Sequence, residues 1–157
     1  MASFRARHSW ILCVNLSIIN PRQPRLFELS KMKLPEGYHT ITPYFTVSDA
    51  DRLIEFIVEV FGGVIVVTNR YPTGRIQHAR IRVGDSVIML NESNEQYPVN
   101  LSQMHLYVDD VDVVFSKALS ADAISIMESN ERPHGDRMAG FKDPCGNIWW
   151  IASHASL

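Results

Sequence analysis

The sequence predicts an α+β domain built from two βαβββ modules that pair their sheets around a cavity. Three observations point to this architecture. A stretch with strand-like alternation opens the region after residue 34, an amphipathic helix pattern follows it, and the whole order of elements returns 61 residues later. We therefore interpret residues 34–157 as one domain of two repeats, about 38–97 and 98–157, preceded by an N-terminal extension over residues 1–33.

The first repeat opens with residues 41–47, which alternate and are rich in β-forming side chains. Ser48 is placed to cap a helix at its N-terminus, and the double glycine at 62–63 ends that helix. The apolar stripe of the helix consists of Ala50, Leu53, Ile54, Ile57, Val58 and Phe61. Three further strands, separated by turn-forming residues, are expected at 64–68, 76–83 and 86–91.

The second repeat has the same order of elements. Residues 101–108 alternate like the first strand, and Asp109 and Asp110 then cap a second helix. The stripe of this helix falls on positions of the first one shifted by 61 residues: Val111, Val114, Phe115, Ala118 and Leu119. The closing strands are expected at 124–127, 137–142 and 148–153, with a turn at 143–146 before the last.

One βαβββ module leaves a face of its sheet bare, because its single helix covers only the other face. Two modules can turn these bare faces toward a shared cavity, which is the natural place for a site. The sequence does not decide whether that cavity forms within one chain or between swapped halves of two chains.

Composition excludes several classes of function. The chain has 157 residues, a net charge of −2 and 46% hydrophobic residues, so it is too apolar for a disordered protein. The near-neutral charge gives no footprint for nucleic acid, and no apolar run reaches the length of a membrane span, so neither partner is expected. Cys13 and Cys145 provide neither a disulfide framework nor a zinc cluster, which predicts a reducing, cytoplasmic location.

Residues 1–31 differ from the rest of the chain, because they hold five basic side chains against Glu28 alone. Their basic start and the mostly apolar stretch from Trp10 to Ile19 leave a signal or transit peptide open. No small-residue cleavage motif follows, and the alternative is an extension that packs loosely or not at all.

Five short segments occur in order along the chain: YHTITPY at 38–44, VSDAD at 47–51, HARIRVGDS at 78–86, HGDR at 134–137 and DPCGNIW at 143–149. Together they make the region from Leu34 to Ser153 resemble the vicinal oxygen chelate superfamily of glyoxalases, bleomycin-resistance proteins and extradiol dioxygenases. Within that superfamily the chain looks most like the PhnB-like branch. The resemblance implies the fold of two βαβββ modules but does not specify a reaction.

Metal-dependent members of that superfamily hold their ion with four ligands, one on the first and one on the last strand of each module. The resemblance places these positions at Thr42, Met89, Gln103 and Trp150. A divalent cation prefers imidazole or hard oxygen ligands, whereas an indole has no lone pair to offer and a thioether is too soft. We therefore expect no metal, and no other cofactor, at the usual family site.

Strand alternation predicts which further side chains face the cavity. His78, His105 and Tyr44 are the candidates for acid–base chemistry, although a buried residue that hydrogen-bonds a neighbour or a water is the favoured interpretation of either histidine alone. Arg80 is placed to clamp an anionic group, or else is a solvated surface arginine. The predicted ligand-binding residues are Thr42, Tyr44, Thr46, His78, Arg80, Met89, Asn91, Gln103, His105, Tyr107, Arg137 and Trp150.

Arg137 ends the segment 130–137, which we interpret either as a lid over the cavity or as a simple turn. The two histidines, paired across the cavity, supply too few ligands for a displaced metal without a carboxylate.

Three functions remain open at this point. The sequence favours a homodimeric protein that binds a small organic molecule in an aromatic cavity, because the usual metal ligands are missing. The first alternative is a glyoxalase-like lyase or isomerase, or a dioxygenase, with a rebuilt or metal-free active site. The second is a scaffold protein that keeps the fold and has lost the site.

Overall fold

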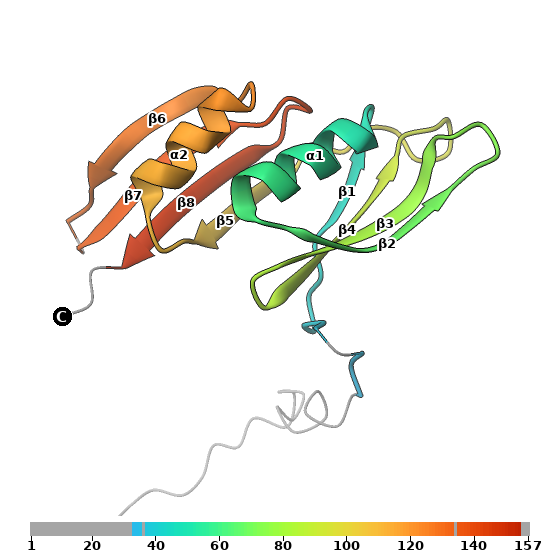
Figure 1. Cartoon of the computed structure of the whole chain (residues 1–157), viewed down its shortest axis with the longest axis horizontal. Helices are drawn as coiled ribbons and strands as arrows, with labels where there is room; N and C mark the ends of the chain where they lie inside the picture. Colours follow the sequence, from blue (N-terminus) through green and yellow to red (C-terminus); the bar gives the residue numbers. More distant parts are fainter. Residues whose placement is uncertain (1–32, 36, 134, 155–157) are drawn as a thin grey trace, which may run out of the picture. The chain divides into compact units, whose positions relative to one another are not determined.

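The computed structural model describes residues 33–35, 37–133 and 135–154, and the expectations for residues 1–31 lie outside this part of the chain. Two repeats of βαβββ follow one another (Figure 1). The first consists of β1 (Tyr44–Val47), α1 (Ala50–Phe61), β2 (Val64–Arg70), β3 (Ile76–Val83) and β4 (Ser86–Glu92). The second consists of β5 (Gln103–Tyr107), α2 (Val111–Ser120), β6 (Ile124–Glu131), β7 (Asp136–Lys142) and β8 (Ile148–His154).

Each repeat forms one four-stranded mixed sheet, with strand orders β1-β4-β3-β2 and β5-β8-β7-β6. The first and last strands of each repeat pair in parallel, and the other neighbours are antiparallel. The register also repeats, because Tyr44 lies opposite Met89 and His105 lies opposite Trp150. The predicted α+β fold of two βαβββ modules is therefore confirmed.

The helices begin at carboxylate caps. Asp49, and not the predicted Ser48, caps α1 by accepting a hydrogen bond from the Arg52 N–H at 3.0 Å. Asp110 caps α2 in the same way, accepting from the Val113 N–H at 3.0 Å. The helix α1 ends at Gly62, whose φ of +65° is the left-handed conformation that glycine adopts without strain.

The buried stripes of the helices differ from expectation at four positions, one of which is Val60, a buried residue outside the predicted stripe. Phe56 is fully buried although it lies off the predicted stripe, because its ring packs on Phe141 of β7 at a centroid distance of 6.0 Å. Val58 and Leu119, which were expected in the core, are exposed instead.

The two repeats share one hydrophobic core, to which both helices contribute. Phe45 of β1 stacks on Trp149 of β8, with ring centroids 5.6 Å apart. Phe61 of α1 lies against the same Trp149 at 4.9 Å and against Phe141 at 6.3 Å. Residues from Leu34 onward accordingly form one compact unit.

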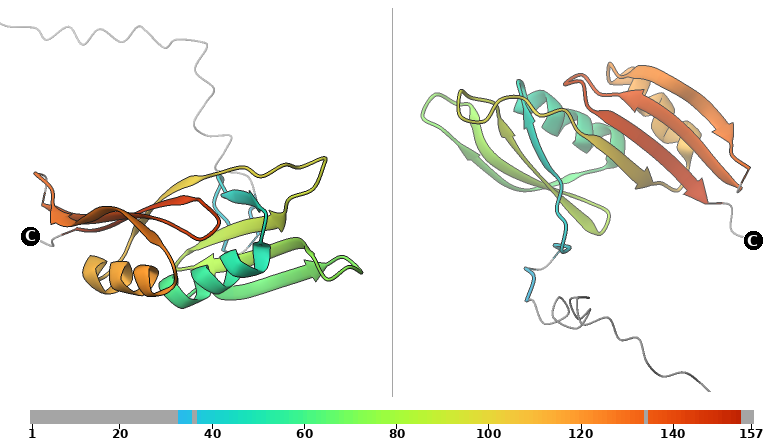
Figure 2. Two further views of the ribbon diagram at one scale, coloured as in Figure 1. Left: turned by 90° about the horizontal axis from the view of Figure 1, so that it is seen from above. Right: turned by 180° about the vertical axis from the view of Figure 1, so that it is seen from behind.

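No described helix packs on the side of each sheet that faces away from α1 and α2, and in this sense that side is uncovered. Figure 1 shows α1 and α2 side by side in front of the strands, and the view from behind in Figure 2 shows β7 and β8 in front of α2. We call the uncovered side of the first sheet open face 1; it carries Tyr44, Thr46, Val67, His78, Arg80, Met89 and Asn91. We call that of the second sheet open face 2; it carries Gln103, His105, Tyr107, Met138, Gly140, Ile148, Trp150 and Ala152.

The two open faces do not face each other within one chain. The helix-facing sides of both sheets converge on the shared core, so the opposite sides turn away from it. Among the described residues, no strand of one sheet pairs with a strand of the other, and the contact between Phe45 and Trp149 lies on the helix-facing sides. None of the described helices combines the length and apolar character needed to cross a membrane.

Candidate functional site

Open face 1 is built from side chains that line up across its strands. The register places Val67, Arg80, Met89 and Tyr44 in one row, and Thr46 next to Asn91 in a neighbouring row. Residues paired across strands project to the same side of a sheet. The sheet therefore gathers six of the predicted ligand-binding residues on one surface: Tyr44, Thr46, His78, Arg80, Met89 and Asn91.

Polar side chains on this face contact one another in pairs. The Tyr44 hydroxyl lies 3.4 Å from His78 Nδ1, and the two rings stack with centroids 6.0 Å apart. The Thr46 hydroxyl donates a hydrogen bond to Asn91 Oδ1 at 2.8 Å. These pairs hold the side chains in fixed positions toward the open side of the sheet.

A hollow of about 430 Å³ lies on this face. Besides Tyr44, Thr46 and Asn91, it is lined by residues that the sequence analysis missed: Tyr71, Gln77, Asn94 and Tyr97. Tyr71 directly precedes the turn after β2, and Tyr97 lies in the connection between β4 and β5. An aromatic residue beside a turn was the only available signal, because loops carry no periodic pattern.

Burial and neighbouring groups shift two pKa values on open face 1. Desolvation lowers the pKa of His78, and the nearby charge of Arg80 lowers it further, so the neutral imidazole is favoured. Desolvation raises the pKa of Tyr44, and Tyr71 and Tyr97 act in the same direction. Arg80 is therefore a cation among uncharged groups.

Open face 2 is aromatic. The indole of Trp150 lies over Gly140, where an added Cβ would come within 2.5 Å of the ring atom Cε3. The rings of His105 and Tyr107 lie 5.2 Å apart, and Tyr107 is 70% exposed. Gln103 is also exposed, at the start of β5. The structure thus groups these predicted residues together, but on a different sheet from Tyr44, His78 and Arg80.

The side chains at the four ligand positions of the family do not fit a divalent cation. The Thr42 hydroxyl donates to the carbonyl of His39 at 3.2 Å, Met89 offers only a thioether, and Trp150 offers no lone pair. Within 33–35, 37–133 and 135–154, no three His, Cys, Asp or Glu side chains come together in a way that would hold an ion.

Arg137 lies apart from the other candidates, on the helix-facing side of the second sheet. Its guanidinium donates two hydrogen bonds to Asp112 of α2, at 2.8 and 2.9 Å, and this contact lowers the pKa of the Asp112 carboxyl. The segment before it is a short hairpin in which the Gly135 N–H donates to the Arg132 carbonyl at 2.9 Å. The structure therefore favours the turn over the lid, and His134 lies outside the described residues.

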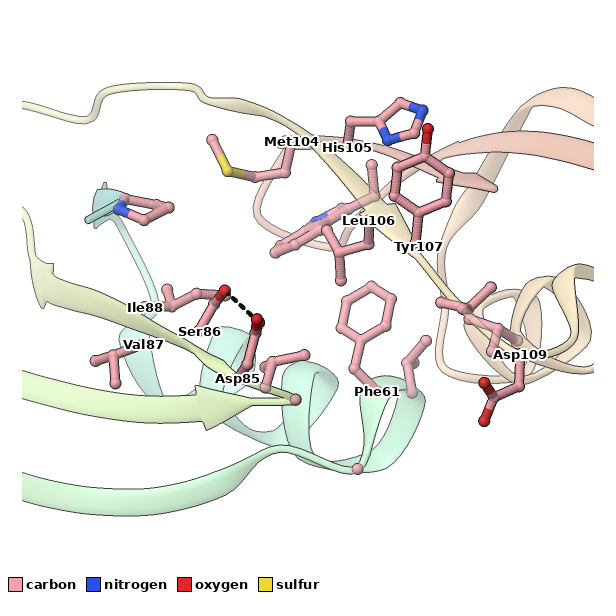
Figure 3. Close-up of a pocket in the computed structure, with 18 of the residues that line it drawn as sticks. Phe61, Asp85, Ser86, Val87, Ile88, Met104, His105, Leu106, Tyr107 and Asp109 are labelled. Carbon is pink, nitrogen blue, oxygen red and sulfur yellow. Dashed lines mark hydrogen bonds between the residues drawn. The ribbon is translucent and has the colours of Figure 1, made fainter. Parts of the chain in front are cut away.

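A larger hollow of about 940 Å³ lies between the two repeats (Figure 3). Its walls are the end of α1, the turn between β3 and β4, the strand β5 and the start of α2. Phe61, Met104 and Leu106 make it mainly apolar, and His105 and Tyr107 are the only predicted site residues along it. We therefore place the candidate site on the two open faces, where the polar and aromatic candidates are concentrated.

Cys145 lies outside the candidate site, in the predicted turn at 143–146. Its Sγ–H donates to the Asp49 carbonyl at 3.2 Å, and burial together with Asp143 and Asp49 raises the pKa of the thiol to about 12. In a Cys13→Ser variant at pH 8, we expect Cys145 to react with a maleimide roughly a thousandfold more slowly than free cysteine. A rate near that of free cysteine, followed by mass spectrometry, would contradict this assignment.

Comparison with known proteins places this geometry in context. Residues 38–151 match the model of the Glyoxalase/Bleomycin resistance protein/Dioxygenase superfamily. The chain is 32% identical over 120 residues to the uncharacterized protein Mb0911c of Mycobacterium bovis, which covers 69% of this chain and 79% of that protein. It is equally similar to the uncharacterized protein Rv0887c of Mycobacterium tuberculosis, with 69% and 71% covered.

Solved structures show the same fold. TioX from Micromonospora sp. ML1 is 25% identical with a TM-score of 0.61, covering 76% of this chain and 98% of that chain. A PhnB protein from Bacillus cereus is 20% identical with a TM-score of 0.57, covering 73% and 99%. The fosfomycin resistance protein FosX from Mesorhizobium loti is 15% identical with a TM-score of 0.55, covering 74% and 92%.

Proposed function

The chain belongs to the Glyoxalase/Bleomycin resistance protein/Dioxygenase superfamily, and from this premise we propose that it binds a small organic molecule between open face 1 of one chain and open face 2 of a second copy. The observation that carries the proposal is that the two faces offer complementary linings and yet turn away from each other in one chain. A homodimer that brings them together encloses a polar wall and an aromatic wall in one cavity.

The exposure of large side chains supports a second copy as the cover. Tyr107 is 70% exposed on open face 2, and Tyr44 is 46% exposed on open face 1. Aromatic side chains of this size are typical of surfaces that bind a partner or a ligand. In a symmetric dimer, open face 1 of each chain lies against open face 2 of the other, so one type of contact covers all four open faces.

Binding without metal chemistry is favoured by the side chains at Thr42, Met89 and Trp150, which are poor ligands for a divalent ion. A flat or amphipathic molecule suits the combination of aromatic rings with a few convergent polar groups.

A second candidate function, a metal-free lyase or isomerase, is favoured by the contact between Tyr44 and His78. A neutral imidazole 3.4 Å from a phenol is suited to accept a proton from a bound molecule. Chromatography of the bound molecule after incubation separates the two functions, because only the enzyme alters its ligand.

The proposal predicts that two variants, each defective in ligand binding by itself, recover binding when they form a mixed dimer. We expect light scattering to give twice the chain mass of 17.8 kDa, and calorimetry to detect binding of 2-naphthoate, 2-naphthamide or both. Tyr44→Ala damages open face 1 and Trp150→Ala damages open face 2, so each homodimer should lose binding of the tighter probe. A mixed dimer of the two variants should bind at half the sites with the wild-type Kd, because one of its two cavities combines two intact faces.

Two results would overturn this proposal. A mass of 17.8 kDa at micromolar concentration would leave no second copy to close the cavity. A mixed dimer that binds neither probe, when the wild-type dimer does, would mean that both faces of the site come from one chain.

A further inference from the structure

Arg80 is one of three described arginines that have no carboxylate partner, with Arg82 and Arg132, and it is the one whose Nε is buried without an acceptor. Four described arginines each hold a carboxylate within 4.0 Å: Arg52, Arg70, Arg75 and Arg137. Throughout the described residues, no Asp or Glu reaches Arg80 at this distance. Arg80 is also half-buried, so water reaches its charge less freely than it reaches a surface arginine.

The hydrogen bonds of the Arg80 guanidinium are incompletely satisfied. Nη1 donates to the Tyr38 hydroxyl at 2.9 Å, whereas Nε is buried and has no acceptor within the described part of the chain. A guanidinium carries five N–H donors: one on Nε and two on each terminal nitrogen. Both donors of Nη2 and the second donor of Nη1 therefore remain for a ligand. The two terminal nitrogens point from one end of the group and match the two oxygens of a carboxylate.

The described neighbours of Arg80 across the sheet carry no negative charge. Its neighbours in the row across the sheet are Val67, Met89 and Tyr44, and the imidazole of His78 follows on the same strand. The nearby phenol of Tyr38 is an uncharged hydrogen-bond partner. A second chain covering this face would remove the remaining water and leave an unpaired buried cation, which is strongly unfavourable.

We propose that Arg80 is an anion subsite and that the molecule bound between the open faces is an aromatic carboxylate. This inference rests on the proposed function and names its ligand class. The carboxylate accepts hydrogen bonds from Nη1 and Nη2 of Arg80, and the aromatic part extends toward Trp150 and His105 on open face 2 of the second copy.

The test compares two probes of the same shape that differ in charge, 2-naphthoate and 2-naphthamide. Hydrogen bonds to charged groups contribute enough for wild-type protein to bind the carboxylate at least about tenfold more tightly than the amide. Arg80→Met keeps an apolar stem and removes the charge. In this variant we expect the two Kd values, measured by calorimetry, to agree within about twofold, with the Kd for the amide unchanged.

Arg82→Met is the matched control. Arg82 lies on the same strand and the same side of the sheet, but it is exposed and pairs in register with Val64 and Val87. We expect this variant to keep the preference for 2-naphthoate. An equal loss in both variants would mean that general positive charge, rather than Arg80, selects the anion, and would overturn the inference.

The remaining outcomes separate this inference from the proposed function. If wild-type protein binds the amide as tightly as the carboxylate, the anion subsite is refuted and the proposed function stands. If neither probe binds to wild-type protein, both the anion subsite and the proposed function are refuted. A carboxylate of the second copy is the competing partner for Arg80, and it predicts that Arg80→Met weakens the dimer in sedimentation experiments. We expect the dissociation constant of the Arg80→Met dimer to be no higher than that of the wild-type dimer. A higher dissociation constant would overturn the inference.

Discussion

Replacing Asp143 with alanine should lower the free energy of unfolding by about 3–5 kcal/mol. The carboxylate is buried and accepts hydrogen bonds from Trp149 Nε1 at 2.8 Å and from Asn147 Nδ2 at 2.9 Å. It also accepts from the backbone N–H groups of Cys145 and Asn147, both at 2.9 Å. Alanine leaves these donors without acceptors in the interior, at about 1–3 kcal/mol for each donor that stays unpaired. Urea unfolding followed by circular dichroism measures the loss.

Two comparison variants separate this network from the general effect of losing a carboxylate. Asp51 pairs with Arg70 at 2.6 Å, but its side chain is 50% exposed, so Asp51→Ala should cost less than about 1 kcal/mol. Asp143→Asn keeps the shape of the side chain and one acceptor oxygen, but its NH2 group cannot accept the hydrogen bonds that the second oxygen accepted. The loss of stability in this variant should lie between those of Asp143→Ala and Asp51→Ala. Equal losses for Asp143→Ala and Asp51→Ala would contradict the role given to the buried network.

Substituting alanine for Gly140 should displace the indole of Trp150 from open face 2. The new Cβ would come within 2.5 Å of Cε3 of that ring, so the indole has to rotate away or the strands have to separate. Overpacking of this kind costs about 1–3 kcal/mol of stability. Because the indole is one wall of the proposed cavity, binding of 2-naphthamide, measured by calorimetry, should weaken about tenfold as well.

A double variant identifies the cause. In a Trp150→Ala background the ring is absent, so Gly140→Ala should cost less than about 0.5 kcal/mol there. If the cost of Gly140→Ala is the same with and without the indole, the close approach of the ring to the backbone is not what selects glycine.

Most of the fold could be predicted because its signals are local and occur twice. Strand alternation is a property of consecutive residues. The 61-residue offset carries Tyr44 and Met89 onto His105 and Trp150, and Tyr44 lies opposite Met89 in the first sheet as His105 lies opposite Trp150 in the second. The cap of α1 was misplaced by one residue, because Ser48 and Asp49 are both favourable capping residues. Phe56 was missed because its burial depends on Phe141, a contact between repeats that no local pattern contains.

The candidate site was predictable where it lies on strands and not where it depends on loops. Alternation correctly grouped Tyr44, His78 and Arg80 on one side of the first sheet. Tyr71 and Tyr97 line the hollow beside Tyr44 from connections, whose paths the sequence does not reveal. Arg137 was predicted to end the segment 130–137 and to begin a strand, and it does belong to β7; its side chain was expected to bind a ligand but projects toward α2.

The aromatic contacts between Phe45, Phe61 and Trp149 make the two repeats thermodynamically dependent on each other. An internal duplication normally starts as two interchangeable copies, but here each half completes the interior of the other. A substitution at one of these aromatic positions in one repeat therefore alters the packing of the other repeat as well. The open faces take no part in these contacts, so a substitution there can change the ligand without disturbing the interior that the two repeats share.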